Sequence, residues 1–317
     1  MFWTILWLAA GFLLLIKGAD FLVKGASSLA RRFNIPEIII GLTIVAFGTS
    51  TPELVVNIVA SVEGRGEVVL GNVIGSNNFN TFFILGVAAL IFPLTIHRSI
   101  ILKEIPYTLI AACAVLLLAN DMLLFNRENN WLGRIDGLIL LGFFIIILIY
   151  IFRNQQNRRL DDSTSASYYS IQKTVLLLAA GFAGLIIGGK LAVDNAVILA
   201  QRIGLSERII SLTVLAAGTS LPELAASAVA AYRKKSDIAI GNIVGSSLFN
   251  IFFILAVSLL IAPVKYPVTF NTDLTLFLAG TVLLILFTYT GRKAKIDRWE
   301  AIVLMGIYIG YTVFLLR

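Results

Sequence analysis

The stretch GLTIVAFGTSTPELVVNIVAS (residues 41–61) decides the fold, because the chain contains it twice. A shift of 170 residues places it on SLTVLAAGTSLPELAASAVAA (211–231), and places GNVIGSNNFNTFFIL (71–85) on GNIVGSSLFNIFFIL (241–255). Between 11–93 and 181–263, 38 of the 83 aligned pairs are identical without a gap. The chain is therefore an internal duplication.

Both copies lie within long apolar runs. Hydrophobic residues make up 58% of the chain and charged residues 14%, against roughly 45–50% and about 25% in soluble domains. A membrane-spanning helix needs about 20 apolar residues. Runs of this kind lie near 3–30, 38–62, 68–92, 103–120, 131–152, 172–200, 206–232, 238–262, 272–290 and 299–316. We therefore predict an all-α membrane protein with ten transmembrane helices.

The duplication and the number of runs together predict the topology. Five spans in each copy is an odd number, so the second copy enters the membrane from the opposite face, as in the inverted repeats of secondary transporters. The predicted organisation is a first repeat over 1–152, a cytoplasmic linker over 153–171 and a second repeat over 172–317.

The distribution of basic residues predicts the orientation. Lys and Arg favour cytoplasmic loops, and fifteen fall on one side of this arrangement against seven on the other. This places both termini outside a multi-pass protein of the inner (plasma) membrane. It also accounts for the net charge of +7 without a nucleic-acid partner, and no protein partner is predicted.

Several classes of protein are disfavoured by what the chain lacks. It has no glycine-rich phosphate loop of the Walker type, which argues against an ATP-driven pump. Its single cysteine, Cys113, excludes a disulfide within the chain. His97 is the only histidine, so an intramembrane enzyme with a histidine or cysteine metal cluster is improbable, and no cofactor is expected.

Two glutamates in the repeated motif carry the chemistry. Glu53 and Glu223 lie deep in apolar runs, where a charged acid costs at least about 2.5–3.5 kcal/mol at the helix centre. Each directly follows a proline, which removes a backbone donor and disturbs the preceding turn. We therefore expect broken helices at both motifs, with the carbonyls of Ala46 and Ala216 freed from their helical partners.

The surrounding polar residues offer oxygen atoms almost exclusively. Hydroxyls three or four residues before each glutamate can share its helix face, and the second motif adds a serine and an asparagine four residues apart. Oxygen ligands suit hard cations such as calcium, and sodium accepts them as well. The candidate ligands are Ala46, Thr49, Ser50, Glu53, Ser76, Asn80, Ala216, Thr219, Ser220, Glu223, Ser246 and Asn250.

Other polar residues in the spans receive structural interpretations. Asn72, Asn77 and Asn242 are interpreted as hydrogen-bonding groups between helices. The charged residues of the first and sixth spans are expected to pair with one another or to reach the interface; these are Lys17, Asp20, Lys24, Lys190 and Asp194.

The paired motifs GTSTPE with GNVIGSNNFN and GTSLPE with GNIVGSSLFN closely resemble those of the cation/calcium exchanger superfamily, and specifically the prokaryotic sodium/calcium exchangers. The resemblance covers the whole chain in span number and inverted halves. It implies a secondary active antiporter that exchanges sodium for calcium by alternating access, with Glu53 and Glu223 as central ligands shared by the two cations. It also implies that the long first and sixth helices slide against the remaining helices.

One position bears on the type of exchanger. Potassium-dependent members carry aspartate at the place of Asn250, whereas this chain has asparagine at both 80 and 250. The resemblance therefore favours the potassium-independent type.

Two further transport functions remain open. Burial favours the neutral form of a carboxylic acid, so protons could replace sodium and the chain would be a cation/proton exchanger. A passive cation channel is the second alternative.

Overall fold

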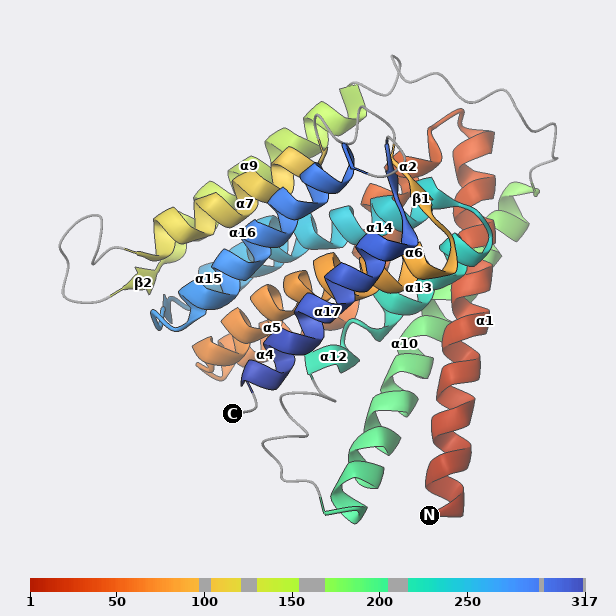
Figure 1. The fold of residues 1–317 in the computed structure, drawn as a ribbon, viewed down its shortest axis with the longest axis horizontal. Coiled ribbons are helices and arrows are strands. Elements are labelled where there is room, and N and C mark those ends of the chain that lie inside the picture. The colour runs from red at the N-terminus through yellow and green to blue at the C-terminus, as the bar shows by residue number, and fades with distance from the viewer. Residues whose placement is uncertain (97–103, 121–129, 154–168, 205–215, 291–293, 316–317) are drawn as a thin grey trace.

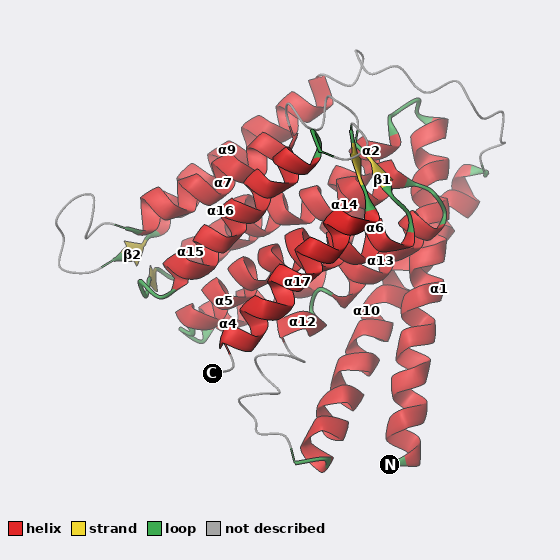
Figure 2. Ribbon diagram, in the orientation of Figure 1, coloured by secondary structure: helices red, strands yellow, loops and turns green. Residues whose placement is uncertain are grey.

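The chain folds into a helical body with two long helices along one side (Figures 1 and 2). The computed structural model describes residues 1–96, 104–120, 130–153, 169–204, 216–290 and 294–315. Most of the predicted linker, 154–168, lies outside the described residues, as does His97.

The first half contains α1 (Phe2–Arg32), α2 (Glu37–Ile40), η1 (Gly41–Val45), α3 (Ala46–Thr49), α4 (Thr51–Val62), α5 (Gly66–Asn78), η2 (Phe79–Ile84), α6 (Leu85–Ile91), β1 (Leu94–Thr95), α7 (Ile105–Ala119), β2 (Trp131–Leu132) and α9 (Arg134–Arg153). The second half contains α10 (Ile171–Arg202), α12 (Ala216–Gly218), α13 (Leu221–Tyr232), α14 (Ser236–Leu248), η6 (Phe249–Leu255), α15 (Ala256–Ile261), β3 (Val264–Lys265), α16 (Phe270–Phe287), β4 (Lys295–Ile296) and α17 (Arg298–Leu315). The η segments are wide, π-type turns inside longer helices.

The described helices make this an all-helical membrane protein. Seven of them are long and apolar enough to cross a bilayer, or eight if the pair Glu37–Thr49 and Thr51–Val62, bent by 46°, is one span. Of the other predicted runs, the fourth corresponds to α7, which is apolar but has only 15 residues. The seventh begins at 206–215, outside the described residues, and ends with α13.

Two continuous helices form the centre of the body. In the most apolar 18-residue stretch of Gly66–Ile91, 72% of the residues are buried, and in that of Ser236–Ile261 the share is 83%. The corresponding share is only 28% in α1 and in α10. A Cβ atom on Gly241 would lie 2.7 Å from the carbonyl oxygen of Ile38, and one on Gly245 would lie 2.6 Å from that of Leu42. Small residues therefore let α14 approach the first repeat's backbone, as expected for helices in a membrane.

The long helices α1 and α10 run antiparallel to each other along the side of this body (Figure 1). Glycines bring the two backbones together at intervals of seven residues along α1. A Cβ atom on Gly11 would lie closest to Ala192, one on Gly18 closest to Leu185 and one on Gly25 closest to Leu178. Positions rise along α1 as they fall along α10, which defines the antiparallel arrangement.

Short strand pairs link the two halves. The strand β1 pairs antiparallel with β4, and β2 pairs antiparallel with β3. Each pair joins a strand of the first half to a strand of the second, so the two pairs connect the halves in the same way.

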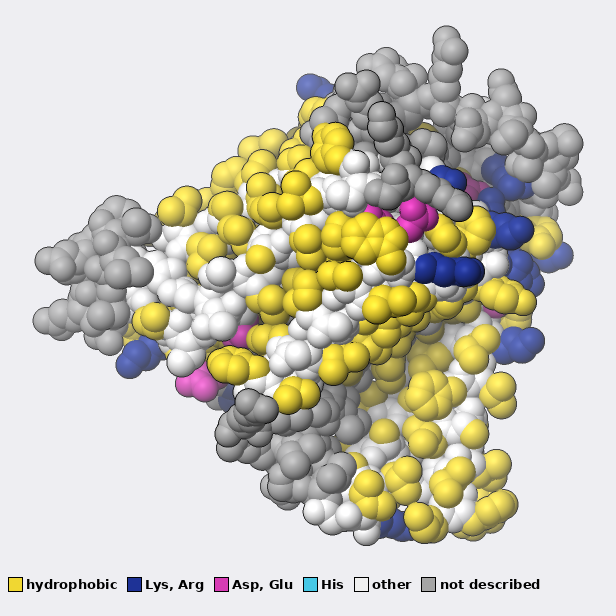
Figure 3. Space-filling view, in the orientation of Figure 1, with side chains coloured by type: hydrophobic (Ala, Val, Ile, Leu, Met, Phe, Trp, Pro, Cys, Tyr) yellow, Lys and Arg dark blue, Asp and Glu magenta, His cyan; other side chains and the backbone are white. Residues whose placement is uncertain are grey.

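Apolar side chains cover much of the outer surface (Figure 3). Trp3, Trp7 and Leu13 on α1 are all more than half exposed, as are Leu176 and Ile187 on α10. Since water would disfavour so much apolar surface, these faces suit lipid.

Candidate functional site: a buried oxygen cluster at two broken helices

Each repeated motif contains a helix break. The helix α3 ends at Thr49 and α4 begins at Thr51, with Ser50 between them at φ −82° and ψ 7°. The second motif repeats the geometry at Ser220, with φ −88° and ψ 8°. A proline occupies the first turn of the helix that follows each break, where its missing N–H costs nothing. The predicted breaks are thereby confirmed.

The predicted release of the Ala46 carbonyl is wrong in this conformation. The Ala46 oxygen accepts the backbone N–H of Ser50 at 3.0 Å and is within 3.2 Å of the Thr49 hydroxyl. The helical bond survives here because Ser50 retains its N–H; proline, which lacks one, follows two residues later. Ala216 is the first residue of α12.

The two breaks meet, and their serines and glutamates exchange hydrogen bonds. Ser50 Oγ donates to Glu223 Oε1 at 2.8 Å, and Ser220 Oγ donates to Glu53 Oε1 at 2.9 Å. Ser220 Oγ also lies 3.1 Å from Ser76 Oγ. The two bonds are equivalent under the 170-residue shift, so each repeat supplies the hydroxyl for the other repeat's carboxylate.

Both glutamates are almost completely inaccessible, with 1% of each side chain exposed. Each has one carboxylate oxygen, Oε2, without a hydrogen-bond partner among the described residues. Burial of a charged carboxylate with an unpartnered oxygen costs free energy unless a positive charge lies beside it. No Lys, Arg or His among the described residues forms an ion pair with either glutamate.

The second motif contributes further buried polar atoms that lack partners. Ser246 Oγ, Asn250 Oδ1 and both polar atoms of the Asn80 side chain are buried and unpartnered within the described part of the chain. Asn250 donates through Nδ2 to Asn77 Oδ1 at 3.2 Å. Asn80 and Asn250 belong to the wide turns η2 and η6, and such turns are frequent at functional sites.

The predicted threonine ligands are positioned by two asparagines from the opposite repeat. Thr49 Oγ1 lies 3.0 Å from Asn242 Oδ1, and Thr219 Oγ1 lies 3.2 Å from Asn72 Oδ1. Hydrogen bonds between the repeats thus connect seven of the predicted side chains, directly or through these asparagines. The other three are not joined to them by hydrogen bonds in the described residues: Asn80 and Ser246 have unpartnered polar atoms, and Asn250 bonds Asn77. Thr219 is partly buried, whereas Thr49 is fully buried.

Sequence reasoning placed Asn72 and Asn242 outside the site, and two more polar residues were not considered at all. These are Asn57 and Ser227, which are equivalent under the 170-residue shift. Asn72 Nδ2 donates to Asn57 Oδ1 at 2.9 Å, and Asn242 Nδ2 donates to Ser227 Oγ at 3.0 Å. The signal available for the asparagines was their identity in both copies of the motif. Asn57 and Ser227 differ between the copies, which concealed them.

The chemistry of the cluster suits a hard cation. Across the described residues, no three His, Cys, Asp or Glu side chains come together, so soft or borderline metals lack their usual ligands. Two carboxylates with hydroxyl and amide oxygens match the preferences of calcium.

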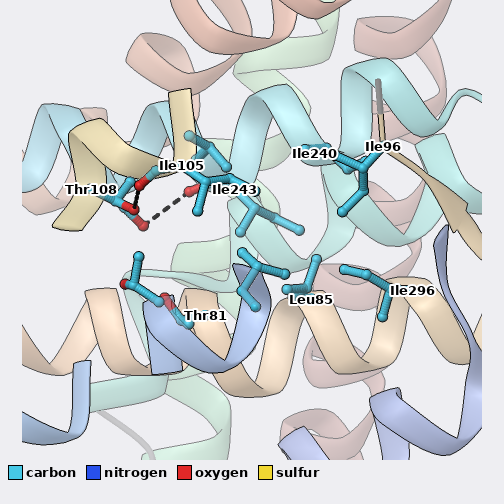
Figure 4. Close-up of a pocket in the computed structure, with 12 residues that line it drawn as sticks. Thr81, Leu85, Ile96, Ile105, Thr108, Ile240, Ile243 and Ile296 are labelled. Carbon is cyan, nitrogen blue, oxygen red and sulfur yellow. Dashed lines mark hydrogen bonds between the residues drawn. The ribbon is translucent and has the colours of Figure 1, made fainter. Parts of the chain in front are cut away.

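A separate small cavity lies outside this cluster (Figure 4). It has a volume of about 20 Å³, with a largely apolar lining that includes Ile105, Ile240 and Ile243. This is room for about one water molecule. None of the predicted ligands lines it.

Comparisons with known proteins agree with this chemistry. The sequence model of the sodium/calcium exchanger protein family matches residues 3–153 and 173–317. The chain is 35% identical to the putative antiporter CaxA of Alkalimonas amylolytica, over 96% of each chain. It is 32% identical to the sodium/calcium exchanger MaX1 of Methanosarcina acetivorans, over 97% of each chain.

A relative from another bacterium and a solved structure extend the similarity. The inner membrane protein YrbG of Escherichia coli K12 is 34% identical over 97% of this chain and 95% of its own length. The structure of the sodium-calcium exchanger NCX_Mj soaked with 10 mM Na⁺ and zero Ca²⁺ superposes with a TM-score of 0.84 at 30% identity, covering 99% of both chains. The chain therefore belongs to the sodium/calcium exchanger family.

Proposed function

We propose that the oxygen cluster between the two helix breaks is the site through which this chain exchanges sodium for calcium. As a member of the family the protein is a secondary antiporter, not an enzyme, and its transported ions are sodium and calcium. The observation that carries the site is the reciprocal bonding of Ser50 to Glu223 and of Ser220 to Glu53. It joins the only two carboxylates of the repeated motifs in one buried place.

The proposed ligands are those that the sequence indicated. The side chains are Thr49, Ser50, Glu53, Ser76, Asn80, Thr219, Ser220, Glu223, Ser246 and Asn250, with the carbonyls of Ala46 and Ala216. The Ala46 carbonyl would join when the Thr49 hydroxyl turns away from it. Since two carboxylates are present, one calcium ion or two sodium ions would neutralise them. Competition for the same charge couples the two ions, because an unneutralised pair is disfavoured in the membrane interior.

We propose ten transmembrane spans in two inverted repeats, 1–152 and 172–317, joined by a cytoplasmic linker at 153–171. Support comes from the reciprocal contacts between the halves and from the antiparallel packing of the equivalent helices α1 and α10. Antiparallel packing of equivalent helices is expected when the axis relating the repeats lies in the membrane plane. The bent pair, α7 and the segment that ends with α13 would bring seven long helices to ten.

The proposed mechanism is alternating access, with α1 and α10 sliding against the other helices. Their mutual contacts run through glycines from Gly11 to Gly25 of α1, which favours movement of the two as a pair. The distribution of basic residues supports extracytoplasmic termini.

A flux measurement tests the function. The purified protein would be reconstituted in sealed vesicles, and uptake of labelled calcium measured under a sodium, a potassium or a proton gradient imposed separately. We expect uptake only with sodium inside and calcium outside. Uptake driven by the proton gradient alone would establish the alternative of a cation/proton exchanger, and uptake without any counter-ion would establish a channel.

A further inference from the structure

The amide groups of Asn72 and Asn242 have an orientation that their surroundings determine. Asn242 Nδ2 lies 3.3 Å from the carbonyl oxygen of Glu223 and 3.0 Å from Ser227 Oγ. A backbone carbonyl only accepts hydrogen bonds, so the amide nitrogen must face it and Oδ1 must face the other way. That oxygen lies against Thr49 of the opposite repeat.

Asn72 repeats the arrangement with the roles of the halves exchanged. Its Nδ2 lies 2.9 Å from Asn57 Oδ1 and 3.4 Å from the carbonyl oxygen of Glu53. Its Oδ1 accepts the Thr219 hydroxyl at 3.2 Å. Each asparagine thus fastens a glutamate's backbone on one side and a threonine hydroxyl on the other.

The threonine proton has to be directed away from a cation if the oxygen is to coordinate it. The Thr49 hydroxyl has one proton and two acceptors within reach, Ala46 O at 3.2 Å and Asn242 Oδ1 at 3.0 Å. When Asn242 accepts the proton, the lone pairs of Thr49 Oγ1 and one lone pair of the Ala46 carbonyl remain for the ion. We infer that Asn242 and Asn72 are positioning residues that act through Thr49 and Thr219, an inference that rests on the proposed cation site.

A double-mutant cycle tests this inference. In vesicles, the variants N242L, T49V and N242L/T49V would be compared for the calcium KM and for kcat. We expect each single change to raise KM about tenfold, the effect of one lost hydrogen bond to a ligand, with a smaller change in kcat. We expect the double variant to be no worse than T49V, because the asparagine has no proton to accept once the hydroxyl is gone.

The outcomes separate the inference from the site itself. Additive effects in the double variant, or no effect of N242L, would overturn the positioning role. No effect of T49V would instead count against Thr49 as a ligand. N120L is the matched control: Asn120 is a buried asparagine that bonds Asn271 across helices, and its loss is expected to leave KM unchanged. If N242L fails to fold, the equivalent cycle of N72L and T219V replaces it.

A different observation concerns charged residues within α1 and directly after α13. Arg233, which follows α13, binds Asp20 on α1 through its guanidinium, with Nε 2.5 Å from Oδ1. Lys24 binds the other oxygen of the same carboxylate at 2.7 Å. Through Asp20, Arg233 connects α1 to the end of α13 on the face predicted to be cytoplasmic.

The equivalent residues of the other repeat carry the opposite charges. A shift of 170 residues places Asp20 on Lys190, Lys24 on Asp194 and Glu63 on Arg233. Attraction is therefore preserved on both faces although every sign is reversed. The equivalent pair is not formed: Glu63 binds Arg65 at 3.0 Å, and within the described chain Lys190 has no ion pair.

We propose that Asp20–Arg233 and Glu63–Lys190 are alternate latches, each holding α1 and α10 in one end state of the exchange cycle. The described conformation has the first latch closed and the second apart. Sliding of the helix pair, part of the proposed function, would open the first and bring Lys190 to Glu63. Ion pairs with partial exposure have modest energies, so each latch biases the two states without locking either.

Cysteine pairs test the latches in a Cys113→Ser background. One variant carries D20C with R233C, and the other E63C with K190C. We expect both pairs to form disulfides under mild oxidation, and each disulfide to stop exchange until reductant is added. The control pair D20C with E63C joins opposite faces and is expected to stay unlinked. Failure of E63C/K190C to link while D20C/R233C links would overturn the proposal.

A charge swap provides a second readout that does not depend on calcium flux. Adding R233E to the E63C/K190C variant is expected to raise its rate of disulfide formation about two- to fivefold, the effect of one partly exposed ion pair. Adding D20K as well is expected to restore the original rate. No change with R233E would contradict a latch, whatever the flux measurements show about the transported ions.

Discussion

At the scale of single residues, the proposed site rests on two buried carboxylates, each of which accepts a hydrogen bond from the other repeat. Glu53 and Glu223 each accept a serine hydroxyl from the other half and retain one unpartnered oxygen. Their charge is compensated by no described basic side chain. In the proposed function, the transported cations supply this positive charge.

Removal of either charge should abolish calcium exchange. E53Q and E223Q keep the shape of the side chain but leave one negative charge for a divalent ion. We expect a loss of at least about 100-fold in sodium-dependent calcium uptake, the scale of one broken buried charge interaction. E67Q, at an exposed acid in the first turn of α5, should behave as the parent. Retained exchange in both site variants would refute the site.

The reciprocal serines make a prediction about symmetry. S50A and S220A each remove one hydrogen bond to the other repeat's glutamate, at 2.8 and 2.9 Å. We expect both to raise the calcium KM about tenfold, with S220A having the larger effect because Ser220 also contacts Ser76. A strong effect in one variant and none in the other would show that only one break takes part in binding.

At the scale of elements, close helix approach holds the two breaks together. Gly241 lies where a Cβ atom would be 2.7 Å from one backbone atom and 2.9 Å from another, Ile38 O and Leu42 N. Backbone atoms cannot move aside as a flexible side chain can. The element that carries Ser246 and Asn250 therefore depends on glycine for its position.

Substitution of this glycine should destabilise the protein. We expect G241A to lower the free energy of unfolding by about 1–3 kcal/mol, as overpacking usually does, and to lower the melting temperature in detergent. G306A in α17 is the control, because no described atom beyond the adjacent residues and the surrounding backbone of its own helix lies within 4 Å of a Cβ at that position. Equal melting temperatures for the two variants would mean that the helices can separate without cost.

At the scale of the whole molecule, the orientation in the membrane decides which helix ends face the cytoplasm. The proposed topology has extracytoplasmic termini, with the end of α1 and the end of α13 in the cytoplasm. Basic side chains gather at the upper right of Figure 3, where these ends lie in Figure 1.

Cysteine labelling should reveal this topology. In a Cys113→Ser background, a membrane-impermeant thiol reagent applied to intact cells or spheroplasts is expected to label W3C at the start of α1. It is expected to label R32C at the end of α1 only after permeabilisation. The reverse pattern would invert the proposed orientation while leaving the site unaffected.

Much of this architecture could be predicted without coordinates. The 170-residue repeat, the apolar runs and the prolines beside Glu53 and Glu223 depend on local sequence, and local sequence determines helix length and helix breaks. The fate of the Ala46 carbonyl was predicted wrongly, because the helical bond from Ser50 N–H persists up to the break. The interpretation of Asn72 and Asn242 as hydrogen-bonding groups between helices is confirmed, but their threonine partners were not predicted, because these lie about 150 to 190 residues away in the chain.

The sequence by itself thus determined the membrane class, the duplication and the identity of the buried acids, since composition and periodicity express the solvent in which each segment lies. Only the tertiary structure decided which oxygen meets which carboxylate, how the amides are oriented and which of two charge-reversed ion pairs is closed. Those features depend on the relative placement of two repeats. That placement rests on contacts between residues about 150 to 190 positions apart, which no local pattern of the sequence expresses.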